Sequence, residues 1–187
     1  NMNDTRNLYY ALCIKIWSGR APEEEARTMV EQARELERLG LPAKMLASGR
    51  TAQGQYHYFE QRYAQAAQMF ERVAAKDSSR FRPEALFRLG DATFELASAA
   101  KGAERRALFA RAATAYERAT QSAPQQGDIY FLALYKLGWA YYNQANQANQ
   151  EEYRKAVEVF GRLVEAYDKL TPAQQSRLGL RGEAIEY

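Results

Sequence analysis

The sequence predicts an all-helical protein, and three observations support that fold class. Alanine, glutamate, arginine, glutamine and leucine, which favour helices, dominate nearly every window of the 187 residues. The alternation of β-branched and polar residues that marks strands is absent. The 11 glycines and 5 prolines are too few for an all-β chain, which needs frequent turns.

Short clusters of turn-forming residues divide the chain into successive helices. Each cluster combines a proline or glycine with small polar residues near an expected helix start. The clearest start is Ala21-Pro22-Glu23-Glu24-Glu25, where carboxylates in the first turn complement the helix dipole. The breaks lie at Ser18–Pro22, Leu39–Pro42, Lys76–Ser79, Ser122–Pro124 and Leu170–Pro172.

A residue pattern recurs in the second helix of each expected pair. A small residue is followed four positions later by a large aromatic residue, and three positions after that by an apolar residue, on one helix face. The three copies are Ala66, Phe70 and Val73; Ala112, Tyr116 and Ala119; and Ala156, Phe160 and Leu163. We expect the alanine to let the paired helix approach closely and the ring to fill the wedge between neighbouring pairs.

The expected first helices also align, through Gly54, Gly90 and Gly138, and the unit around Gly54 has a length of about 34 residues. With these motifs the chain resembles the tetratricopeptide repeat family. The best-matching unit contains Leu134, Leu137, Gly138, Tyr141, Ala156 and Phe160. The resemblance implies a right-handed superhelix (an α-solenoid) of stacked antiparallel helix pairs, whose first helices line a concave surface.

This resemblance divides the chain into five segments. They are a divergent N-terminal hairpin (1–42), three repeats (43–80, 81–127 and 128–170) and a truncated C-terminal helix (171–187). The second and third repeats are lengthened, and we expect longer helices over Ser98–Arg111 and an exposed loop or frayed helix end over Asn143–Gln150. Lengthened repeats are similar to bacterial cell-envelope tetratricopeptide proteins, which favours a periplasmic or envelope location.

Few residues of the chain could carry chemistry. His57 is the only histidine, which excludes a histidine metal cluster or a two-histidine proton relay, and we interpret it as a packing residue. Cys13 is the only cysteine and lies on an apolar stripe, so we expect it to be buried and structural. The sequence therefore predicts no catalytic residue, no metal site and no cofactor.

Clustered charges do not change that prediction. Glu151 and Glu152 point in different directions on a helix, so we interpret them as solvated first-turn charges. The arginines Arg105, Arg106, Arg111 and Arg118 are interpreted as a solvated outer face. The glycines are scattered rather than grouped in a phosphate-binding loop.

A partner would contact the inward positions of the first helices, as the family resemblance implies. Most of these positions are aromatic, although aromatic residues make up only 12% of the chain, and exposed rings are favoured at recognition surfaces. Gln55 and Glu95 complete the inward set, and Trp139 is the expected anchor. The candidate partner-binding residues are Tyr58, Phe59, Phe87, Asp91, Phe94, Tyr135, Trp139, Tyr142 and Asn143.

The function that follows is a non-catalytic module that holds a peptide or protein partner in an aromatic groove, as part of a larger assembly or scaffold protein. Two alternatives stay open: a structural spacer or oligomerisation module with covered rings, and an accessory domain of an enzyme whose catalytic part lies outside this sequence. The helical spacing that continues over Leu180–Tyr187 leads us to expect a fragment of a longer protein.

Two classes of partner are disfavoured. The net charge of +3 is too small to indicate nucleic-acid binding, and the inward Asp91 and Glu95 oppose it. No stretch of about 18 apolar residues lacks charges, so we expect no insertion into a membrane. The sequence leaves the oligomeric state open.

Overall fold

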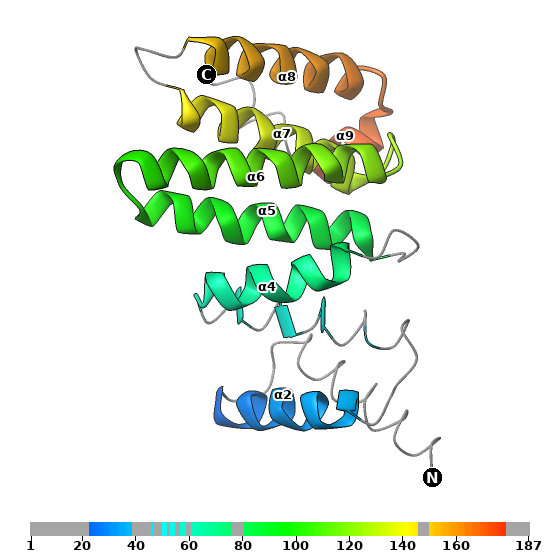
Figure 1. Ribbon diagram of the computed structural model, residues 1–187. Helices are drawn as coiled ribbons and strands as arrows, with labels where there is room; N and C mark the ends of the chain where they lie inside the picture. Colours follow the sequence, from blue (N-terminus) through cyan, green and yellow to red (C-terminus); the bar gives the residue numbers. More distant parts are fainter. Residues whose placement is uncertain are drawn as a thin grey trace. The chain divides into compact units, whose positions relative to one another are not determined.

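A computed structural model of the chain (Figure 1) describes residues 23–38, 46, 50, 51, 53, 54, 57, 58, 61–75, 81–145 and 150–178. Regular structure in these residues is entirely helical, which confirms the predicted fold class for this part of the chain. The helices are α2 (Glu23–Arg38), α4 (Tyr63–Ala74), α5 (Arg82–Ala99), α6 (Gly102–Ser122), α7 (Asp128–Gln144), α8 (Glu151–Tyr167) and α9 (Pro172–Leu178).

The chain forms two compact units, Asn1–Ala85 and Leu86–Tyr187, whose boundary lies inside α5. Helices α2 and α4 belong to the first unit. The second unit contains most of α5 together with α6, α7, α8 and α9. Within the second unit α6 packs against α7, and α7 packs against α8 (Figure 1).

Several helix ends follow from local sequence signals. Helix α6 ends at Ser122, before Pro124. Helix α9 begins after Thr171, whose Oγ1 accepts a hydrogen bond from the Gln174 backbone N–H at 3.4 Å. In return the Thr171 N–H donates to Gln174 Oε1 at 3.0 Å, so each of the two otherwise orphaned backbone donors has a side-chain oxygen as acceptor, across one helical turn.

The longer helices expected over Ser98–Arg111 are present, but a tight turn interrupts them. Helix α5 ends at Ala99 and α6 begins at Gly102, which adopts a φ of 58°. Glycine reaches this left-handed region without steric cost, and this explains how two long helices reverse direction over two intervening residues. Over Asn143–Gln150, α7 ends at Gln144 and α8 begins at Glu151, while residues 146–149 lie outside the described residues.

The core of the second unit is built from leucine, alanine and aromatic side chains. Each fully buried leucine or phenylalanine contributes about 1.5–3 kcal/mol of burial free energy. The buried set includes Leu86, Leu89, Phe109, Ala112, Tyr116, Phe131, Leu134, Leu137, Ala156, Val159 and Leu163. All three pattern alanines are buried, Ala112 and Ala156 here and Ala66 in the first unit, as a close approach of the paired helix requires.

The glycines and aromatics of the repeated pattern meet in direct contact. A Cβ added to Gly90 would stand 2.5 Å from the Tyr116 ring, and one added to Gly138 would stand 2.5 Å from the Phe160 ring. In the first unit the corresponding distance from Gly54 to the Phe70 ring is 2.8 Å. Each ring therefore occupies the space left by a glycine of the preceding helix, which differs from the expected wedge between neighbouring pairs.

Candidate partner-binding surface

Five aromatic rings of α7 and α8 form a connected ladder. Tyr135, Trp139 and Tyr142 share one face of α7 because they are spaced by three or four residues. Trp139 meets Tyr135 at a centroid distance of 6.3 Å, Tyr142 at 5.6 Å and Phe160 of α8 at 5.7 Å, while Tyr142 meets Tyr153 of α8 at 5.6 Å. All four contacts are edge-to-face, the geometry that the ring quadrupoles favour. We call these five residues the aromatic ladder.

The aromatic ladder extends from the contact between α7 and α8 to the surface. Phe160 lies against Gly138, and Trp139 and Tyr135 are half-buried. At the outer end Tyr142 is 50% exposed and Tyr153 is 39% exposed. The ladder thus presents apolar ring surface to solvent on rings whose orientation is fixed by their neighbours.

A polar edge borders the ladder at the end of α7. Asn143 donates from Nδ2 to the Trp139 carbonyl at 2.9 Å, and its Oδ1 accepts from Arg105 Nη2 of α6 at 3.4 Å. The Arg105 guanidinium also lies 4.8 Å above the Phe109 ring. Asn143 is therefore held in place beside the ladder.

Phe94 of α5 is connected to α6 and α7. Its ring packs edge-to-face on Phe109 at 4.9 Å, and the ammonium of Lys136 lies 5.4 Å from the centroid of the Phe94 ring. Lys136 directly follows Tyr135 in α7. Phe94 is thus half-buried and lies next to α7, with the Lys136 ammonium over its ring.

Phe87 and Asp91, two further candidates, are buried. The Phe87 ring packs on Tyr116 at 5.8 Å, and the Tyr116 hydroxyl donates to Asp91 Oδ1 at 2.8 Å. Burial raises the pKa of the Asp91 carboxyl above its ordinary value, although the hydrogen bond from Tyr116 and the charges of Lys136 and Arg88 oppose that rise. Both residues present almost no surface to a partner, and we leave them out of the candidate surface.

The first unit contains the remaining candidates. The Tyr58 ring is half-buried and contacts Tyr63 at 5.3 Å. Phe59 lies outside the described residues. A single continuous surface from Tyr58 to the ladder stays a prediction.

His57 is a neutral packing residue. It is buried, and Arg34 Nη2 lies 3.4 Å from its Nε2 atom. Burial first, and then the charges of Arg34 and Arg62, lower the pKa of His57 to about 4. Since a guanidinium can only donate, Nε2 accepts and the ring is uncharged near neutral pH. Cys13 lies outside the described residues.

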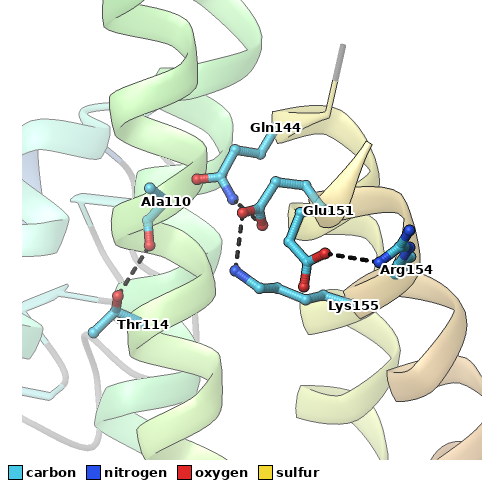
Figure 2. A network of polar contacts seen from close by, with 7 residues as sticks. Ala110, Thr114, Gln144, Glu151, Arg154 and Lys155 are labelled. Atoms are coloured by element: carbon cyan, nitrogen blue, oxygen red, sulfur yellow. Dashed lines mark hydrogen bonds and ion pairs between the residues drawn. The ribbon is translucent and has the colours of Figure 1, made fainter. Parts of the chain in front are cut away.

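Glu152 departs from the expected solvated charge. Gln144 Nε2 donates to Glu152 Oε2 at 2.7 Å and Lys155 Nζ donates to Oε1 at 2.9 Å, so both oxygens of this buried carboxylate are paired. Glu151 is exposed, as expected, and pairs with Arg154 (Figure 2). The prediction was wrong for Glu152, which ties the end of α7 to the start of α8.

The described residues offer no group of three or more histidine, cysteine, aspartate or glutamate side chains arranged to hold a metal ion. None of the helices in this part of the chain is long and apolar enough to cross a membrane. Comparison with protein-family models, with curated proteins and with solved structures finds no match to this chain.

Proposed function

We propose that this protein is a non-catalytic interaction module and that the aromatic ladder binds a peptide or protein partner. The observation that carries the proposal is the half-exposed ring of Tyr142, held in edge contact with Trp139 and Tyr153. Rings fixed in this way lose little rotamer entropy on binding and can bury a large apolar area.

The chemistry around the ladder favours a partner with apolar or aromatic anchors flanked by acidic residues. Lys136 follows Tyr135 in α7, with its ammonium over the Phe94 ring, and Arg105 holds Asn143 beside Trp139. Carboxylates of a partner would meet these cations at the rim, where they contribute orientation and association rate more than affinity.

The proposal extends to the architecture. Three contacts between a glycine and an aromatic ring, one in the first unit and two in the second, support stacked tetratricopeptide-like helix pairs forming an α-solenoid. Such a solenoid would act as a scaffold within a larger assembly, and the resemblance of the lengthened repeats favours the bacterial envelope as its location.

A structural spacer is the second candidate, because the inward residues Phe87 and Asp91 are buried. In a spacer the groove would be filled intramolecularly, and the ladder would bind no free peptide. The accessory domain of an enzyme remains an alternative with the same surface.

The test begins with peptides selected from a random library on the full chain. In a Trp17→Phe variant Trp139 is the only tryptophan, since the sequence contains two. Peptide binding at the ladder should change the Trp139 emission saturably, with the same midpoint as binding measured by calorimetry. Selected peptides that bind without any change in Trp139 emission would place the binding site elsewhere and contradict the proposal.

A further inference from the structure

Helix α8 carries an apolar stripe on its solvent-facing side. Val157 is 72% exposed, Val164 is 46% exposed and Tyr153 is 39% exposed. Gly161 lies between the two valines, and a Cβ added there would meet no atom within 4 Å. Spacings of three or four residues place these side chains on one face, which we call the outer stripe.

The opposite face of α8 is already used for the core, through Ala156, Val159 and Leu163. A surface helix of a globular protein normally has one apolar face, and clustered exposed apolar residues mark interaction sites. Beside the outer stripe lies a hollow of about 560 Å³, lined by Gln150, Tyr153, Arg154, Val157 and Glu158. An apolar stripe, an open glycine and a hollow thus coincide on one helix face.

We propose that a second copy of this chain covers the outer stripe, with the two α8 helices antiparallel about a two-fold axis at Val157. A surface that pairs with itself in this way must be self-complementary. Residues at equal distances before and after Val157 then meet across the axis. Tyr153 precedes Val157 by four positions and Gly161 follows it by four, so each large ring faces the open glycine of the other copy.

The charges beside the stripe select the same arrangement. Arg154 and Glu158 lie four positions apart on one edge of the outer stripe, on either side of Val157. The two-fold axis keeps the edge that carries Arg154 and Glu158 on the same side of the seam in both copies. Arg154 of one copy then lies two residues, about 3 Å along the helix axis, from Glu158 of the other, within reach of these long side chains. In a parallel two-fold pair these edges would lie on opposite sides of the seam. Charged residues flanking a helix seam are known to set orientation in this manner.

The existing partner of Arg154 does not prevent this. Its ion pair with Glu151 measures 3.5 Å, and the two side chains are 82% and 58% exposed (Figure 2). Exposed pairs of this kind contribute little to stability, so Arg154 can exchange partners at small cost. The proposal does not depend on peptide binding by the aromatic ladder, although the two surfaces share Tyr153.

Sedimentation equilibrium of the full chain over a range of concentrations tests the proposal. The wild type should sediment with twice the mass of one chain at high concentration. Val157→Glu should weaken the association at least about tenfold, because it buries two carboxylates at the axis. The variant should keep the wild-type circular dichroism, since Val157 is largely exposed in the single chain.

Charge exchange gives the sharper result. Arg154→Glu and Glu158→Arg should each weaken the dimer, and the double variant should restore association to within about twofold of the wild type. Arg118→Glu, which reverses an exposed arginine on α6, is the matched control and should have no effect. A wild type that stays monomeric at about 200 µM would overturn the proposal, because a specific dimer interface should associate at this protein concentration. A dimer that tolerates Val157→Glu, or one that the double variant does not restore, would overturn it as well.

Discussion

The ring of Phe160 lies so close to Gly138 that a Cβ on the glycine would stand 2.5 Å from a ring carbon. The same ring meets Trp139 at 5.7 Å, so this contact between α7 and α8 also orients the central member of the aromatic ladder. Close packing at one glycine therefore supports both the hairpin and the surface that we propose for binding.

Gly138→Ala should destabilise the protein by about 1–3 kcal/mol, because the added methyl group must displace a packed ring. Gly161→Ala is the matched control on α8. Its Cβ meets no neighbour in the single chain, so it should stabilise by up to about 1 kcal/mol through helix propensity. Urea titrations of both variants at low protein concentration measure the two effects, and equal effects of the two changes would contradict this account of the glycine contact.

Tyr116→Phe should cost about 1–3 kcal/mol, because it removes the hydroxyl that donates to the buried Asp91. Asp91→Asn keeps an acceptor for that hydroxyl and removes a buried charge, so near pH 7 it should cost less than Tyr116→Phe or even stabilise. A folded-state pKa raised by burial means that protonation of Asp91 favours the folded state. The wild type should therefore gain stability relative to Asp91→Asn as the pH falls. Unfolding curves at two pH values that give the same difference in unfolding free energy between the two proteins would contradict this titration of Asp91.

The free energy of unfolding should also depend on the titration of His57. Here stability should fall, rather than rise, as the pH falls. The pKa of His57 is lowered from 6.5 to about 4, so the unfolded chain binds the proton first as the pH falls. The stabilisation that comes from holding His57 neutral is complete above pH 6.5 and is lost between pH 6.5 and 4. Between pH 7.5 and 5.0 the wild type should lose about 1–2 kcal/mol relative to His57→Gln. Denaturant titrations that give the same difference at both pH values would show that His57 is not held neutral by its surroundings.

Local signals predicted the helical class and several helix ends. The break at Leu170–Pro172 was predictable from the sequence because the residues that cap α9, Thr171 and Gln174, lie within one turn of each other. The turn at Gly102 was missed, since one glycine among strong helix formers carries little local information. Its positive φ is required only because α5 and α6 must reverse direction there.

Tertiary contacts decided the rest of the site. Glu151 and Glu152 look alike in the sequence. The contact with Gln144 at the end of α7, together with the ion pair to Lys155, makes the second a buried, paired carboxylate. The hydrogen bond from Arg105 to Asn143 joins residues 38 positions apart, and no local sequence pattern predicts it. Tyr153 could have been found from its spacing to Val157, whereas its contact with Tyr142 depends on how the hairpin closes.

Binding through the aromatic ladder is the central claim, and one paired measurement tests it most directly. Calorimetric titration of a library-selected peptide into the wild type and Tyr142→Ala gives the binding loss, and urea unfolding of the same proteins gives the stability loss. Tyr130→Ala is the matched control, because Tyr130 lies on α7 and its ring contacts Phe131, outside the ladder.

Tyr142→Ala should weaken peptide binding by about 2 kcal/mol, as expected for an aromatic anchor. The same change should cost less than about 1 kcal/mol of stability, because the side chain is 50% exposed. Tyr130→Ala should leave the affinity within about twofold of the wild type. Unchanged affinity in Tyr142→Ala, or an equal loss in Tyr130→Ala, would contradict the account.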